Sequence, residues 1–428
     1  MTALNAPVTV EENVPEGREA ILAPIKWRDP VVAAIMTVIA LVLALMTRGS
    51  SNISFSGATS WFDMGTMTVP GLPTNLVLTV IAAICTALIF RRALARETPP
   101  GWLLVVVGFA LVCVFLIWMV AGEGNRLPVV SLLEGALMFA VPLTFGALSG
   151  VVNERSGIIN IAIEGQLLFG AFAGALVGSM FHNPWMGLIG APIAGMLIAV
   201  LLALFTIKYR ADHIIVGVVL NMLALGLTSF LFSTLLKQHS SLNQNLKLPD
   251  IPIPILKDIP IIGPVVFNQS ILVYAMLIAV LALQFMVFRS RWGLRMRAAG
   301  EHPKAADTVG IKVNLIRWQN VLLGGALAGL GGAFFTLGQG LAFSKDMAAG
   351  NGFIALAAMI LGRWNPKGAF AAALLFGFAT NMGFVMQAVG ANIPSEFVLM
   401  IPYVITILAV AGFVGAVRAP AAEGKPYP

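Results

Sequence analysis

Long apolar runs separated by short polar connectors occupy nearly the whole chain. A hydrocarbon core of about 30 Å requires roughly 20 apolar residues per helix, and about twelve runs of this kind can be recognised. They cover residues 31–46, 72–90, 102–120, 129–151, 158–181, 186–205, 214–236, 265–288, 318–338, 353–361, 369–386 and 397–413. Because a helix satisfies its own backbone hydrogen bonds in lipid, these runs predict an all-α, polytopic transmembrane helix bundle of about 12 spans.

The tenth run, residues 353–361, is too short to span a bilayer without tilting. Glycines and a proline flank it at Gly350, Gly352, Gly362 and Pro366. This pattern predicts a broken or re-entrant segment, which a membrane tolerates only against protein or a water-filled cavity.

Composition excludes an ordinary soluble protein. Only 11% of the residues are charged and 58% are hydrophobic, whereas soluble domains average roughly 25% charged residues. Cys85 and Cys113 lie inside apolar runs, which favours buried thiols over a disulfide framework or a zinc site. The four histidines are scattered, so neither a metal-ligand nor a hydrolytic constellation has support.

The basic residues lie mostly at the ends of the apolar runs. With the N-terminus inside, all but six of the 26 lysines and arginines fall on the same side. The exceptions are Arg48, Arg126, Lys237, Lys247, Lys257 and Lys345. By the positive-inside rule, both termini are predicted to be cytoplasmic and the number of spans to be even. The formal charge of +7 therefore indicates topology rather than binding to nucleic acid. The polar, acidic stretch before Lys26 does not resemble a signal peptide, so the first span is expected to be retained.

Two loops exceed the short connectors. Residues 237–264 are predicted to lie outside, and their prolines favour an extended backbone that could form a docking surface. Residues 289–317 are predicted to be cytoplasmic, with a turn at Gly300 and a short helix over 304–309 that ends at Gly310. Composition alone favours a solvated basic connector here, since runs of charge usually are solvated.

Three ordered segments carry a family resemblance. They are NERSGIINIAIEGQLLFGAF at 153–172, GLRMRAAGEHPKAADTVGI at 293–311 with GALAGLGGAFF at 325–335, and GNGFIALAAMILGRWNPKGA at 350–369. These segments resemble signatures of inner-membrane ABC importer permeases of the branched-chain amino acid and simple-sugar superfamily, most of all its nucleoside-type branch. The resemblance covers about 129–415. It divides the chain into an N-terminal extension with three predicted transmembrane helices (1–127), a permease core (128–415) and a cytoplasmic tail (416–428).

The resemblance implies a multi-pass protein of the bacterial cytoplasmic (inner) membrane that is not itself an enzyme. In such importers a coupling segment inserts into a cleft of the ATP-binding subunit, and Gly300, Glu301, Ala306 and Gly310 would form this contact here. The chain has no GxxxxGK[ST] phosphate loop, so no cofactor is expected in it, and ATP and Mg are expected on the partner subunit. The further partners implied are a second permease subunit, more often different than identical, an external solute-binding protein, membrane lipid and a small polar solute.

Polar residues within apolar segments are candidates for the translocation pathway. Asn160, Glu164 and Gln166 occur in the second signature, and an ionisable residue at membrane depth usually faces a cavity or a polar partner. Asn160 and Glu164 have i, i+4 spacing, which would place them on one helix face. Asn221 and Asn320 are further candidates. For each residue the alternative is that it only bonds a broken helix end or a neighbouring span.

Two other functions remain open from the residues alone. An ion-gradient-driven secondary transporter would also show many spans and membrane carboxylates, although it would not need the coupling loop. Within the ABC class, nucleosides, simple sugars and branched-chain amino acids are all handled by one architecture. The nearly neutral predicted route favours a nucleoside or a related sugar-like solute.

Overall fold

The computed structural model describes residues 26–55, 65–122, 124, 126–388, 400 and 418–427. In this part of the chain, ten helices are long and apolar enough to cross a membrane. They are α1 (Arg28–Met46), α2 (Gly71–Leu94), α3 (Gly101–Val120), α4 (Val129–Glu154), α5 (Ile163–Met180), α6 (Pro184–Ala203), α7 (His213–Leu231), α8 (Ile271–Arg289), α11 (Val313–Ala333) and α13 (Pro366–Ala388). The predicted helical, polytopic architecture is confirmed, and the predicted span at 397–413 lies outside the described residues except for residue 400.

The helix limits depart from the apolar runs at two places. α5 begins only at Ile163, and the preceding stretch from 158 to 162 is not helical. α8 begins at Ile271, because Asn268–Ser270 forms strand β5 and pairs with β4 (Asp250–Pro252). The loop at 237–264, which is predicted to lie outside, is also less extended than expected, since it contains the 3₁₀ turns Ser240–Leu242 and Leu256–Asp258.

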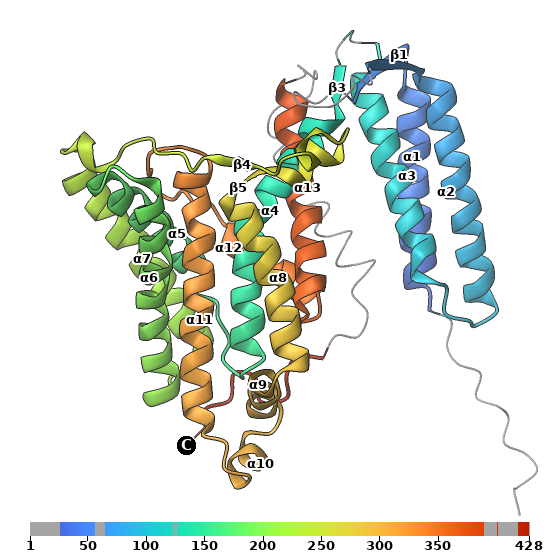
Figure 1. Ribbon diagram of the computed structural model, residues 1–428. Helices are drawn as coiled ribbons and strands as arrows, with labels where there is room; N and C mark the ends of the chain where they lie inside the picture. The colour runs from blue at the N-terminus through green and yellow to red at the C-terminus, as the bar shows by residue number, and fades with distance from the viewer. Residues whose placement is uncertain are drawn as a thin grey trace, which may run out of the picture.

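The first three spans form a separate bundle (Figure 1). Small and apolar side chains pack inside it, including Ala33, Ala82 and Val107, which have no exposed surface. A three-stranded sheet in the order β2-β1-β3 connects this bundle to the remainder, and β3 leads directly into α4 (Figure 1). Its strands are β1 (Ser50–Ser54), β2 (Thr66–Pro70) and β3 (Arg126–Pro128). These strands were not predicted from the sequence.

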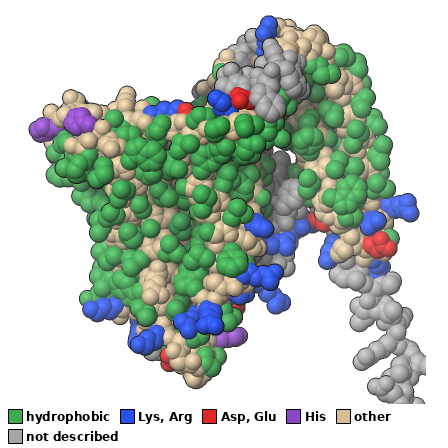
Figure 2. All heavy atoms as spheres, in the orientation of Figure 1, with side chains coloured by type: hydrophobic (Ala, Val, Ile, Leu, Met, Phe, Trp, Pro, Cys, Tyr) green, Lys and Arg blue, Asp and Glu red, His purple; other side chains and the backbone are tan. Residues whose placement is uncertain are grey.

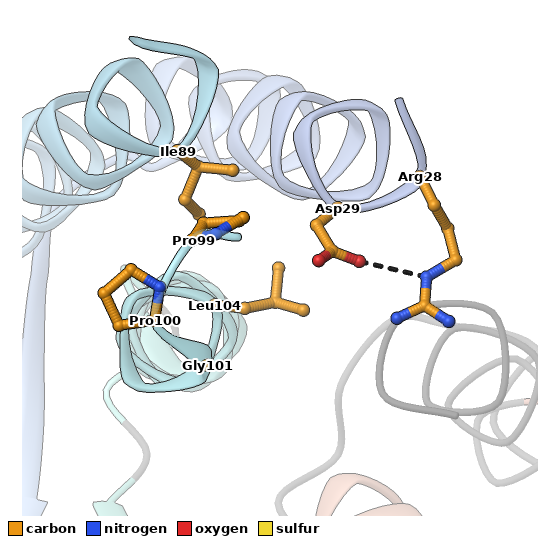
Figure 3. A pocket seen from close by; sticks show the side chains of 7 residues that line it. All are labelled: Arg28, Asp29, Ile89, Pro99, Pro100, Gly101 and Leu104. Carbon is orange, nitrogen blue, oxygen red and sulfur yellow. Dashed lines mark hydrogen bonds and ion pairs between the residues drawn. The ribbon is translucent and has the colours of Figure 1, made fainter. Parts of the chain in front are cut away.

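A small pocket of about 120 Å³ lies at one end of this bundle, where α1 meets the α2–α3 connection (Figure 3). The residues that line it are Arg28, Asp29, Ile89, Pro99, Pro100, Gly101 and Leu104. An ion pair of 2.9 Å between Arg28 Nε and Asp29 Oδ1 lies at its side. All residues that line the pocket belong to α1–α3 and the α2–α3 connection, and none belongs to the candidate site described below.

The remaining helices pack around α4, α5 and α11. The most apolar stretches of these helices are 83%, 67% and 72% buried, against 22% in α7, which lies at the periphery. Glycines permit the closest approaches: a Cβ at Gly170 would overlap the backbone of Gly329, and one at Gly195 would overlap the carbonyl of Gly325. Small residues of this kind let membrane helices pack through backbone contact.

The tenth predicted run is confirmed as a short helix, α12 (Asn351–Leu361). Eleven residues reach about 16 Å, which is half of a bilayer core. α12 lies within the helical body beside α4 and α13, as expected for a broken segment (Figure 1).

Two further short helices, α9 (Arg291–Glu301) and α10 (Pro303–Thr308), lie at one end of the bundle. Residues 418–427 and the beginning of α1 lie at the same end (Figure 1). Many of the lysines and arginines visible in Figure 2 gather there. This is the distribution that the positive-inside argument expects, and the cytoplasmic placement of this end remains a prediction.

Candidate coupling site and translocation pathway

The sequence signals for a short helix after residue 302 are confirmed by α10. Pro303 occupies its first position, and Gly310, with φ of +83°, ends the turn that follows. The helix before it was not predicted. Ser290 Oγ accepts a hydrogen bond of 3.1 Å from Gly293 N and so starts α9. The predicted turn at Gly300 is wrong, because Gly300 lies in the last turn of α9.

Gly300 is needed there for packing. A Cβ at this position would overlap the carbonyl of Arg155, so only glycine lets α9 lie directly on the α4–α5 connection. Arg155 Nε donates to Trp364 O at 3.0 Å, and the guanidinium lies 5.5 Å from the centre of the Phe288 ring. Burial lowers the pKa of Arg155, and the nearby Arg297 lowers it further. One residue therefore joins α9, α8 and the turn after α12.

The four residues expected to contact the ATP-binding subunit divide into two groups. Gly300 and Ala306 are buried, and Ala306 packs in the cluster that contains Met296 and Val313. Glu301 and Gly310 are exposed. The buried pair therefore holds the loop on the helical body, while the exposed pair and the neighbouring Val309, which is 74% exposed, form its accessible surface.

Glu164 joins two helix beginnings. Its Oε1 accepts a hydrogen bond of 2.7 Å from Gly350 N, and its Oε2 accepts one of 2.6 Å from Gly352 N. The carboxylate thus caps α12 from the first turn of α5, at the positive ends of both helix dipoles. This is the alternative in which a membrane carboxylate bonds a broken helix end, and a role in the pathway remains a prediction.

Three predicted pathway amides support the non-helical stretch before α5. Asn160 Nδ2 donates to Ser149 Oγ at 3.1 Å and to Gln166 Oε1 at 3.0 Å, and all three side chains are fully buried. Asn221 Oδ1 accepts from Gly165 N at 2.8 Å, and its Nδ2 donates to Ile161 O at 2.9 Å. The predicted shared helix face of Asn160 and Glu164 is wrong, because Asn160 precedes the start of α5.

Asn320 lies on α11 and donates from Nδ2 to Ile316 O at 2.8 Å within its own helix. Its Oδ1 is buried and has no hydrogen-bond partner among the described residues. Four of the five predicted residues therefore lie near the start of α5: the bonded pair Asn160 and Gln166, Glu164, and Asn221. The fifth, Asn320, lies apart from them on α11.

Arg317 was treated in the sequence only as a topological charge, yet its side chain is buried. It is 1% exposed, and its Nε donates to Ser156 O at 3.2 Å. A buried guanidinium requires partners for its donors. Carbonyls of distant segments accept from Nε and Nη1, whereas Nη2 has no hydrogen-bond partner among the described residues. The position of Arg317 directly before an apolar run is the only signal in the sequence that could have indicated a buried arginine.

Among the described residues, no group of three or more His, Cys, Asp or Glu side chains is placed to hold a metal ion.

Known proteins share sequence with this chain over most of its length. The family model described as branched-chain amino acid transport system, permease component, matches residues 132–410. The chain is 40% identical to the guanosine ABC transporter permease protein NupQ of Bacillus subtilis, over 69% of this chain and 96% of that protein. It is 41% identical to the nucleoside ABC transporter permease protein NupC of Lactococcus lactis, over 68% and 94%. The guanosine ABC transporter permease protein NupP of Bacillus subtilis is 28% identical, over 64% and 79%.

No solved structure matches the chain significantly. The family match covers α4 to α13 and leaves α1–α3 outside it. With its apolar helices and this match over more than half its length, the chain is a multi-pass inner-membrane protein and belongs to the ABC transporter permease family of branched-chain amino acid transport system components.

Proposed function

We propose that this chain forms the pathway for a nucleoside in an ATP-driven importer. The observation that carries the proposal is the identity of 40% and 41% to two permeases named for guanosine and nucleosides, over nearly their whole length. The uncharged amides around the start of α5 suit a neutral solute with hydroxyls and a base edge, since they can both donate and accept hydrogen bonds.

We propose that ATP and Mg bind to a separate ATP-binding subunit that contacts α9 and α10. The exposed Glu301 and Gly310 would meet that subunit, and the buried Gly300 and Ala306 would transmit its movement to the helical body. A second, different permease subunit and an external solute-binding protein complete the proposed assembly. Similarity to both NupQ and NupP, two guanosine permeases of one organism, supports a pair of unlike subunits.

We propose Asn160, Glu164, Gln166, Asn221 and Asn320 as the polar framework of the pathway. Glu164 would act by holding α12 in place, because both of its oxygens are already engaged by backbone N–H groups. The amide groups of Asn160 and Gln166 would act indirectly, by fixing the backbone conformation of residues 158–162. Contact with the solute would then require this stretch or α12 to move.

The test is uptake of labelled guanosine, adenosine, ribose and leucine into vesicles that contain the chain with its ATP-binding subunit, second permease and binding protein. Nucleoside uptake that disappears without the ATP-binding subunit is the expected result. Uptake that continues without it would contradict ATP coupling and favour a gradient-driven carrier. Uptake of ribose or leucine alone would assign a different solute.

Charge reversal at Glu301 provides a second test of coupling. The variant Glu301→Lys should hydrolyse ATP with little solute uptake, since Glu301 lies on the accessible surface of the loop. Lys208→Glu, at an exposed residue outside α9 and α10, is the control for charge reversal and should leave uptake per ATP unchanged. Normal uptake per ATP in Glu301→Lys would contradict the assignment.

A further inference from the structure

Residues 418–427 fold back onto the end of the bundle that carries α9 and α10 (Figure 1). Ala422 N donates to Gly300 O at 2.9 Å, and Gly424 N donates to Gly157 O at 3.1 Å. One short turn of the tail therefore bonds α9 on one side and the α4–α5 connection on the other. Pro420 and Ala422 are buried in this position.

A second set of contacts fixes the tail to α11. Arg317 Nη1 donates to Lys425 O at 3.1 Å, while Nε of the same guanidinium donates to Ser156 O. Because Arg317 is fully buried, the tail carbonyl supplies a partner that the cation would otherwise lack. Removal of the tail would leave that donor without its described partner.

The tail also reaches the predicted contact surface. Ala421 N donates to Glu301 Oε2 at 3.2 Å, and the ring of Tyr427 packs on the apolar cluster that includes Met296 and Ala306. The tail thus touches α9, the apolar cluster that holds α10, the α4–α5 connection and α11.

The turn at residues 420–425 is stabilised by its own backbone bonds and by a glycine. Two hydrogen bonds close it, from Glu423 N to Pro420 O at 3.0 Å and from Lys425 N to Ala422 O at 3.3 Å. Gly424 has φ of +71°, and a Cβ there would lie 2.8 Å from Ile159 Cδ1. Any L side chain at 424 is therefore strained by the left-handed backbone conformation, and the end of the Ile159 side chain would have to shift to admit it.

We propose that residues 418–427 act as a clamp that positions α9 and α10 on the α4–α5 connection and α11, so that movement of these helices is passed to the transmembrane body. The proposal rests on the proposed ATP-coupled function. Without the clamp, α9 keeps its packing at Gly300 but loses the bonds that tie its last turn, through the tail, to Gly157 and Arg317. The subunit that drives α9 would then move it with less effect on the spans.

The test compares Gly424→Ala with Ala419→Ser, a matched control at an exposed residue before the bonded turn. Both variants are assembled as the complete transporter in proteoliposomes, and labelled guanosine uptake is measured per ATP hydrolysed. Gly424→Ala should lower this ratio about fivefold, which corresponds to about 1 kcal/mol of lost coupling, the net contribution of one hydrogen bond. Ala419→Ser should leave it unchanged.

A chain ending at residue 417 is the second variant, and its ratio should fall at least as far. The amount of assembled complex and its thermal midpoint are measured in parallel, because a merely structural tail would change these and leave the ratio intact. A normal ratio in both variants, with ATP-dependent uptake by the unmodified complex, would overturn the clamp alone. Uptake by the unmodified complex that needs no ATP would overturn the proposed function instead.

Discussion

Replacing Glu164 by glutamine tests whether its carboxylate stabilises the broken helix α12. The carboxylate accepts hydrogen bonds from Gly350 N and Gly352 N, one on each oxygen. Glutamine keeps one carbonyl oxygen, but its amide group would present N–H donors to the other backbone N–H. One charge-assisted bond and the favourable charge at a helix beginning are both lost, which together are worth about 2–4 kcal/mol.

The assay is the thermal midpoint of the purified chain, measured beside uptake by the assembled transporter. Glu164→Gln should lower the midpoint by several degrees and reduce uptake. Glu134→Gln is the matched control, since Glu134 is a half-buried carboxylate on α4 with no hydrogen bond among the described contacts. A midpoint for Glu164→Gln equal to that of the control would refute the capping argument. A lowered midpoint with unchanged uptake would refute the pathway role alone.

Three further predictions use other contacts. Gly300→Ala should abolish coupled uptake and weaken assembly, because its Cβ would overlap the Arg155 carbonyl. ATPase activity and uptake are measured in the same vesicles, and normal uptake would contradict the packing. Burial raises the pKa of Glu423, although a hydrogen bond with Glu154 partly offsets this; docking of the tail should therefore be favoured at low pH and weaken as pH rises through the raised pKa. Hydrogen exchange of the tail should show this change, and Glu423→Gln should abolish it. Deletion of 1–127 should leave the remaining helices inserted, as measured by membrane yield, since the family match begins at 132.

The spans could be predicted because long apolar runs have one stable solution in lipid, and α12 because its run was too short and flanked by glycine. α10 could be predicted because Pro303 and Gly310 are local signals for the beginning and end of a helix. These features depend on properties that each segment carries in its own sequence. Contacts between distant segments carry no such signal.

The strands, the start of α5 and the docked tail were missed for this reason. β1 is a short polar segment, and its pairing with β2 and β3 is set by backbone bonds rather than by an apolar pattern. α9 was missed because its arginines obscure the buried face formed by Gly293, Met296, Ala299 and Gly300. The tail binds mainly through the N–H and C=O groups of alanine and glycine, which any sequence possesses.

The contacts of Arg155 connect the proposed coupling loop to the Glu164 junction. Arg155 donates a hydrogen bond to the carbonyl of Trp364, just after α12, and Gly300 packs on the carbonyl of Arg155 itself. Glu164 holds the other end of α12. α12 is therefore a rod of about 16 Å between the two sites. Arg155→Met should remove the guanidinium bond to Trp364 while keeping an apolar stem, and so lower uptake per ATP.

A double-mutant cycle with Arg155→Met and Glu164→Gln distinguishes a rigid connection from two independent sites. If α12 transmits movement, releasing one end already disengages it, so the second substitution should cost much less than it does alone. Independent sites would instead give additive losses in the free energy of coupling. Additivity within about 0.5 kcal/mol would therefore exclude α12 as the connection, even if each single variant is impaired.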